Sequence, residues 1–132
     1  MTTTDGNGNS NGHGTGRYTM RFLAQEFLDL FENHWCAGPT AMNAEAEDVD
    51  VDDPTAVRWC SDGALRRAEF IARRQGNVEL CGALLRFEEA WGIEADNQGW
   101  GDGWDGIVAA NEDEDGGLPA VRKLLKAVGG IK

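Results

Sequence analysis

Apolar residues recur at helical spacing in four separate segments of the chain. In the first segment they are Met20, Leu23, Ala24, Phe27, Leu30 and Phe31. This spacing places them along one face of a helix, and Thr19, just before them, has the side chain of an N-cap. The pattern predicts a helix from about residue 20 to residue 33.

The second apolar stripe follows a clear helix-start signal. Asp53 is a residue type that caps helices, and Pro54 suits the first helical turn, where a missing N–H costs nothing. The stripe itself consists of Val57, Cys60, Ala64, Ala68 and Ile71. We predict one helix from Pro54 to about Gln75, ended by Gly76.

A third helix is predicted from about Asn77 to Trp91, because apolar residues lie on two neighbouring sides of it. One side carries Leu80, Leu84, Phe87 and Trp91, and the other carries Val78, Cys81 and Leu85. A helix with so much apolar circumference is expected at the centre of a bundle. A last helix is predicted to start near Pro119, with Val121, Leu124, Leu125 and Val128 facing the core.

The segments between these helices are richer in glycine and acidic residues. Residues 34–53 and 92–106 are expected to be connections. The apolar piece from Ile107 to Ala110 is compatible with a strand or with one helical turn. No alternation of apolar and polar residues, which strands would show, extends over a useful length. The predicted fold class is all-α, a small bundle of about four helices.

The first sixteen residues differ in composition from the rest of the chain. Residues 1–16 are mostly Thr, Gly, Asn, Ser and Asp, which cannot bury enough apolar surface to offset the entropy of ordering. We expect a disordered tail at 1–16 and a single helical domain at 17–132, since 132 residues suffice for one core. Because no apolar run opens the chain, neither a secretory signal nor a membrane span is expected.

Acidic residues outnumber basic ones by 23 to 12, which gives a formal net charge of −11. Such a surface repels the phosphates of nucleic acids, so direct nucleic-acid binding is not expected. The same negative charge is compatible with binding to a basic protein partner or with adaptation to a cytoplasm of high salt concentration. Three cysteines at irregular spacing do not form a disulfide framework, which favours a reducing, cytoplasmic location.

Three blocks of sequence carry a family resemblance. They are Trp35-Cys36-Ala37-Gly38, then Asp53-Pro54-Thr55-Ala56-Val57-Arg58-Trp59-Cys60, then Gly63-Ala64-Leu65. They resemble an uncharacterised family, a domain of unknown function in small bacterial and bacteriophage proteins. In that family a Trp-x-x-Gly element precedes an Asp-Pro-x-Ala-Val-x-Trp-Cys-x-x-Gly-Ala-Leu helix. Ala110-Asn111-Glu112 stands where the family's closing element has Trp-Asn-Asp. The resemblance implies a bacterial or phage-infected cell as the location and assigns no catalytic residue.

Few residues of the chain suit catalysis. A Ser-His-acid triad would need Ser61 and His34 to meet, and their spacing does not indicate it. His34 is better explained as a cation at a helix C-terminus. Cys36, Cys60 and Cys81 form no Cys-x-x-Cys pair, the usual source of zinc ligands, and the last two are expected on buried faces. No catalytic residue, metal or cofactor is therefore expected, and an enzyme is the less favoured interpretation.

Two acidic segments resemble the start of a calcium-binding loop. The first positions of an EF-hand loop are matched by Asn111, Asp113, Asp115 and Gly116. The twelfth position of this loop, which requires a Glu, is Arg122. In the second segment, which begins at Asp48, the twelfth position is Trp59. We interpret both segments as solvated acidic surface. This surface comprises Asp48, Asp50, Asp52, Asp53, Asp102, Asp105, Asp113 and Asp115.

Aromatic and basic side chains alternate on the outer face of the predicted 54–75 helix, a composition that interface hot spots favour. The alternative is that the aromatic rings pack inside the bundle while the arginines extend toward Glu69 and Glu79. Trp100 and Trp104, in the Gly- and Asp-rich segment 99–106, have the same two interpretations: they anchor that segment or they contact a partner. The candidate partner-binding residues are Trp59, Arg66, Phe70, Arg73, Trp100 and Trp104.

These observations favour a small acidic, non-enzymatic interaction protein. A phage accessory or anti-defence factor that inhibits a host protein by occupying its basic surface would fit. An alternative is a small enzyme or divalent-cation-dependent factor that places a cation among Asp102, Asp105, Asn111 and Asp113. A third possibility is a virion or self-assembling component.

Overall fold

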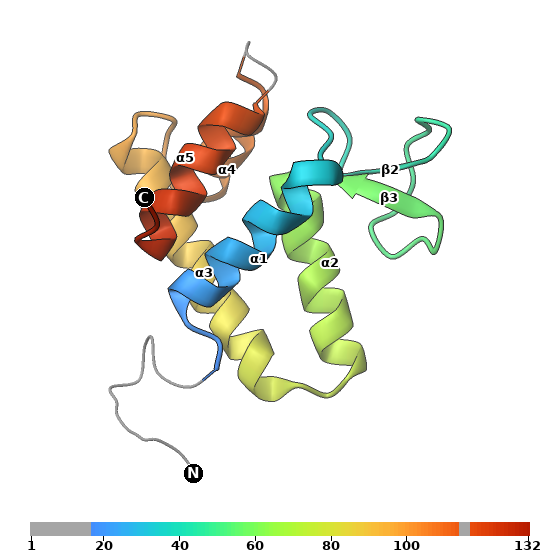
Figure 1. The fold of residues 1–132 in the computed structure, drawn as a ribbon, viewed down its shortest axis with the longest axis horizontal. Helices are drawn as coiled ribbons and strands as arrows, with labels where there is room; N and C mark the ends of the chain where they lie inside the picture. Colours follow the sequence, from blue (N-terminus) through green and yellow to red (C-terminus); the bar gives the residue numbers. More distant parts are fainter. Residues whose placement is uncertain (1–16, 114–116) are drawn as a thin grey trace.

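The computed structural model describes residues 17–113 and 117–132. The expected disordered tail at 1–16 and Asp115 lie outside these ranges. The described elements are α1 (Met20–Asn33), β2 (Ala41–Asn43), β3 (Ala56–Trp59), α2 (Ser61–Arg74), α3 (Val78–Asn97), α4 (Gly103–Asn111) and α5 (Leu118–Gly129). The protein is mostly helical, but the prediction of an all-α bundle of about four helices is wrong in two respects. The described residues form five helices, and a two-stranded sheet is added beside them (Figure 1).

Helix α3 lies at the centre of the bundle, as its wide apolar surface predicts. It contacts each of the other four helices. Phe87 and Trp91 on α3 are fully buried and pack on Phe27 of α1. The ring centroids of Phe27 and Phe87 lie 5.4 Å apart in a stacked arrangement, and Trp91 lies 5.7 Å from Phe27. This aromatic cluster fixes α1 across α3.

Helix α1 has the bounds that its apolar spacing predicts. Its N-cap is Thr19, whose side-chain oxygen accepts a hydrogen bond of 3.0 Å from the backbone N–H of Phe22. On its other side α1 packs along α5 (Figure 1). A Cβ atom at Gly129 of α5 would lie 2.6 Å from the Cβ of Ala24, so the two helices approach at van der Waals distance only because Gly129 has no side chain.

The predicted helix over 54–75 is wrong in its first part. Asp53 does not cap a helix; its carboxylate accepts hydrogen bonds from the backbone N–H and the hydroxyl of Thr55, which closes a turn instead. Residues 56–59 then form β3, antiparallel to β2. Helix α2 begins only at Ser61, where the sulfur of Cys60 accepts from the N–H of Gly63.

The segment from 92 to 106, predicted to be a connection, is largely helical. Helix α3 continues to Asn97, and α4 starts at Gly103 and includes the apolar piece Ile107 to Ala110. A Cβ atom at Gly92 would lie 2.8 Å from the Cα of Gly103. The glycine-rich composition therefore serves the close packing of α4 on α3 as well as the turn between them.

Candidate protein-binding surface

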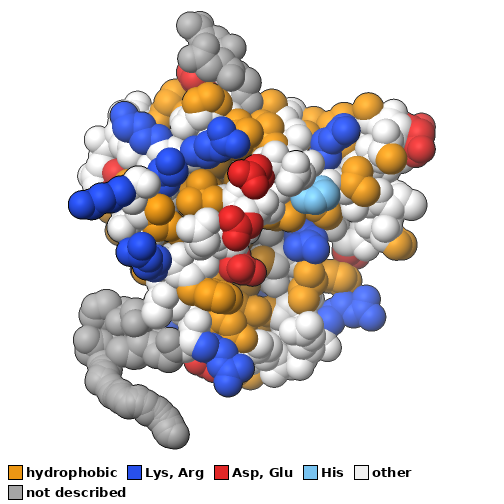
Figure 2. Space-filling model, viewed as in Figure 1, with side chains coloured by type: hydrophobic (Ala, Val, Ile, Leu, Met, Phe, Trp, Pro, Cys, Tyr) orange, Lys and Arg blue, Asp and Glu red, His pale blue; other side chains and the backbone are white. Residues whose placement is uncertain are grey.

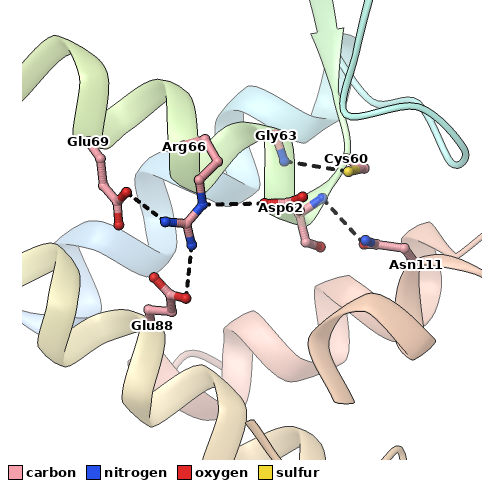
Figure 3. Close-up of polar contacts among 8 residues, drawn as sticks. Cys60, Asp62, Gly63, Arg66, Glu69, Glu88 and Asn111 are labelled. Carbon is pink, nitrogen blue, oxygen red and sulfur yellow. Dashed lines mark hydrogen bonds and ion pairs between the residues drawn. The ribbon is translucent and has the colours of Figure 1, made fainter. Parts of the chain in front are cut away.

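Arg66 of α2 holds three carboxylates together. Its Nε lies 3.3 Å from Asp62 Oδ1, its Nη1 lies 2.7 Å from Glu69 Oε1, and its Nη2 lies 2.9 Å from Glu88 Oε2 (Figure 3). Asp62 and Glu69 belong to α2, one turn before and after Arg66, whereas Glu88 comes from α3. The guanidinium carbon also lies over the ring of Trp104, 5.0 Å from its centroid. Arg66 thus connects α2, α3 and α4.

The charges in this network do not balance, and the pKa values of its members reflect this. Burial raises the pKa of Asp62 and of Glu69, and the attraction of Arg66 only partly opposes the effect. Burial also works against the charge on Arg66, but Glu88, Glu69 and Asp62 outweigh it, so the pKa of the guanidinium is raised. One cation shared by three carboxylates is strongly stabilised, whereas each carboxylate receives only a share of the cation and is repelled by the others.

Two surface depressions lie on either side of Arg66. One, of about 310 Å³, is lined by Glu88, Glu89, Gly92, Ile93, Asp96, Asp102, Gly103 and Trp104. The other, of about 430 Å³, is lined by Thr40, Asp50, Val51, Asp52, Arg66, Glu69, Phe70 and Arg73. Arg66 joins them, because it lines the second depression while its guanidinium contacts Glu88 and Trp104 of the first.

We call the lining of these two depressions the acidic face. Its carboxylates are Asp50, Asp52, Glu69, Glu88, Glu89, Asp96 and Asp102. Only Arg66 and Arg73 carry positive charge among the lining residues, and Arg66 is already engaged with three carboxylates. The face therefore offers unbalanced negative charge beside an indole ring, Trp104, that is 39% exposed.

The structure divides the candidate partner-binding residues into two groups. Trp59 is core, with 7% of its surface exposed, and Arg67 covers its ring at 4.7 Å. Trp100 is half-buried against the core, so it anchors the chain before α4. The remaining four residues, Arg66, Phe70, Arg73 and Trp104, line the acidic face.

The predicted acidic surface is likewise only partly assembled in one place. Asp50, Asp52 and Asp102 line the acidic face. Asp48 and Asp105 are exposed outside it, and Asp113 is half-buried. The carboxylate of Asp53 is used in its turn, where the hydroxyl and the N–H of Thr55 lower its pKa.

Sequence reasoning missed Glu88, Glu89, Ile93 and Asp96 as surface residues of interest. The last three are spaced by four and three positions, so they share one side of α3. That spacing could have been recognised in the sequence. The position of α4 against this side of α3 could not, because it depends on how α4 folds back on α3.

His34 and Ser61, the residues considered for a catalytic triad, make separate contacts, and the buried Ser61 hydroxyl has no hydrogen-bond partner among the described residues. The ring nitrogen Nδ1 of His34 lies 2.8 Å from the carbonyl oxygen of Val57 and, facing an acceptor, must donate to it. Ser61 is fully buried, and its backbone N–H donates to the side-chain oxygen of Asn111 at 3.3 Å. Across the described ranges, no three His, Cys, Asp or Glu side chains are placed to hold a metal ion.

The cysteines are mostly enclosed. Cys36 and Cys60 are buried, and burial raises the pKa of the Cys36 thiol to about 11. Burial also raises the pKa of Cys60. Cys81, predicted on a buried face, is only half-buried, because the side of α3 that it shares with Val78 and Leu85 is not covered by another helix; both of those neighbours are exposed.

Comparisons of this chain with models of protein families, with curated proteins and with solved structures give no match. Among the helices that the structure describes, none combines the length and the apolar character needed to cross a membrane.

Proposed function

We propose that this protein binds another protein without catalysis, and that its acidic face accepts a basic surface of that partner. The proposal is carried by one observation: seven carboxylates and two arginines line two adjoining depressions that also present Trp104. Complementary charge steers association and selects partners. A half-exposed tryptophan adds contact area at low entropic cost and can stack with an arginine or lysine.

The electrostatics of the face support this function. Within the face, the raised pKa of Glu69 means that burial and the repulsion of Glu88 work against its charge. Cations from a partner would reduce that repulsion. Part of the binding free energy would therefore come from relief of an unfavourable interaction that is already present in the free protein.

The biological setting that we propose rests on the family resemblance and on charge. The blocks around Trp35, Asp53 and Gly63 resemble small bacterial and bacteriophage proteins. A phage accessory or anti-defence factor that covers a basic, nucleic-acid-binding surface of a host protein would act as an inhibitor by competing with the nucleic acid.

Titration with a fluorescent arginine- and lysine-rich peptide tests the acidic face. The wild-type protein should bind the peptide, with an affinity that falls as salt rises. The double variant Glu89→Lys/Asp96→Lys should weaken binding at least tenfold, because both side chains line the depression beside Trp104. Fluorescence anisotropy at two salt concentrations measures both effects.

A charge-matched control separates a site from general attraction. Glu32→Lys/Glu112→Lys changes the net charge by the same amount at two exposed positions that do not line the acidic face. This control should keep most of the affinity. Equal weakening by the two double variants, or no binding by the wild-type protein, would sink the proposal.

A further inference from the structure

A second surface feature lies between α1 and α2, with α3 beneath it. It is a groove of about 520 Å³, lined by Tyr18, Phe22, Leu23, Glu26, Phe27, Asp29, Leu30, Ala64, Arg67, Ala68, Ile71, Leu80 and Leu84. Most of these side chains are apolar, and Phe22 is 43% exposed. On the face drawn in Figure 2, hydrophobic side chains gather below a short row of acidic ones, over the space between α1 and α2.

The walls of the groove are held by contacts that do not involve its contents. Helix α1 is fixed on its far side by α5, where Ala24 meets Gly129. Helix α2 is fixed at its start by the residue just before β2, because Gly63 lies against the backbone of Thr40. One end is closed by a hydrogen bond of 3.0 Å from Asn77 Nδ2 to the hydroxyl of Tyr18. The groove is therefore preformed, which lowers the cost of filling it.

The charges along the groove are asymmetric. Glu26 and Asp29 lie three positions apart on α1, so both carboxylates stand on the same wall. Arg67 is the single cation among the lining residues, and it is placed over the ring of Trp59. An occupant that covers the apolar floor would thus meet two carboxylates on the α1 side.

We propose that this groove binds an amphipathic, basic α-helix of a partner protein. The apolar face of such a helix would contact Phe22, Leu30 and Ile71, and its lysines or arginines would face Glu26 and Asp29. This inference shares with the proposed function the expectation of a basic partner, but it uses a separate surface, so either can fail alone.

A second copy of this chain fits the groove less well. Its own basic helix, α5, has Val121, Leu124 and Leu125 fully buried in the core and cannot offer them to a neighbour. The exposed apolar side chains of α3 are Val78, Leu85 and Ile93. Apart from Arg86, the charged residues along α3 are acidic, so this helix would set mainly carboxylates against the acidic α1 wall. Like charges placed together disfavour that pairing.

Two synthetic helical peptides test the groove. Both carry leucines at positions i, i+3, i+4 and i+7; one has lysine and the other glutamate at the remaining positions. The wild-type protein should bind the lysine peptide at least tenfold more tightly than the glutamate peptide. Glu26→Lys/Asp29→Lys should weaken the lysine peptide at least tenfold, while Glu32→Lys/Glu112→Lys, which makes the same change in net charge and lines neither surface, should not.

An uncharged variant and a measurement of size complete the test. Ile71→Asn should weaken both peptides, because it places an amide in the apolar wall, and circular dichroism checks that the variant is folded. Unchanged binding by Glu26→Lys/Asp29→Lys, equal affinity for both peptides, or weakening by the Glu32→Lys/Glu112→Lys pair to the same extent would overturn the proposal. So would a concentration-dependent dimer in sedimentation that Ile71→Asn abolishes, because the occupant would then be a second copy.

Discussion

Among the described residues, Arg66 is the only cation within ion-pair distance of Asp62, Glu69 and Glu88, and its replacement should be costly. Methionine would keep much of the apolar stem but leave three carboxylates without their counter-charge, and Glu69 is only 8% exposed. Removing one partner of a buried pair costs about 3–5 kcal/mol, and screening reduces this at an arginine side chain that is 37% exposed. We expect Arg66→Met to lower the free energy of unfolding by about 2–3 kcal/mol, measured by urea denaturation.

Arg73 provides the matched control, because it is a neighbouring exposed arginine of the same helix. Arg73→Met should change the free energy of unfolding by no more than about 0.5 kcal/mol. Equal losses in the two variants would show that the network around Arg66 contributes nothing beyond a surface charge.

The raised pKa of Glu69 predicts a particular pH dependence of stability. Because burial raises this pKa above its ordinary value of 4.5, the folded protein holds the proton more tightly than the unfolded chain does. The stabilisation from that proton is complete below pH 4.5 and is lost as the pH rises through the folded-state pKa. Glutamine at this position does not titrate. Wild type and Glu69→Gln should therefore be similarly stable near the acidic end, and the variant should be the more stable one at neutral pH.

Urea denaturation of both proteins across this pH range gives the comparison. If wild type instead gains stability over Glu69→Gln as the pH rises, the attraction of Arg66 outweighs burial, and the carboxylate is stabilised rather than strained.

At the scale of elements, the contact between the chain entering β2 and the start of α2 depends on one missing side chain. A Cβ atom at Gly63 would lie 1.7 Å from the carbonyl oxygen of Thr40, which is backbone and cannot rotate away. Gly63→Ala should therefore push the strand and the helix apart and lower the free energy of unfolding by about 2–4 kcal/mol, as severe overpacking does. Thermal and urea denaturation measure the loss.

Gly82 of α3 is the control for this prediction. A Cβ atom there would meet only the end of the Arg86 side chain, at 3.5 Å. Gly82→Ala should raise stability by about 0.5–1 kcal/mol, because alanine costs less entropy than glycine inside a helix. A Gly63 variant as stable as the Gly82 variant would show that the approach of Thr40 is not a constraint.

The elements that local signals define were predictable from the sequence. Helix α1 has its apolar spacing and its cap within fifteen consecutive residues, and its predicted bounds are confirmed. The strand β3 was missed because residues 44–55 separate it from its partner, β2, so no tight-hairpin signal marks the pair. Asp53-Pro54 was also ambiguous, since the residue types that cap helices also form turns. Where the local sequence is compatible with both a helix start and a turn, the pairing with another strand decides which one forms.

At the scale of the whole molecule, the sequence indicated the charge of the candidate surface better than its position. Trp104, Asp102 and Asp50 were singled out, and they lie on the acidic face. Trp59 was a candidate for the partner-binding surface, with packing inside the bundle as the alternative, because it was placed on a helix that does not exist at that position. As part of β3 it is buried in the core, as the alternative had it. The acidic face joins residues from α2, α3, α4 and the connection between β2 and β3, and no local pattern reports that assembly.

The packing of α1 along α5 has a consequence for how a cell makes this protein. A hydrogen bond from Arg21 to the carbonyl of Gly130 joins residues 109 positions apart. At ribosomal rates of about 5–20 residues per second, α1 emerges roughly 5–20 s before its counterpart is synthesised. During that interval the nascent chain exposes Leu23, Phe27 and Phe31, which only the complete bundle covers. Newly made chains therefore pass through a stage in which the side of α1 that packs on α5 is exposed, and only the contacts with α3 can form before synthesis is complete.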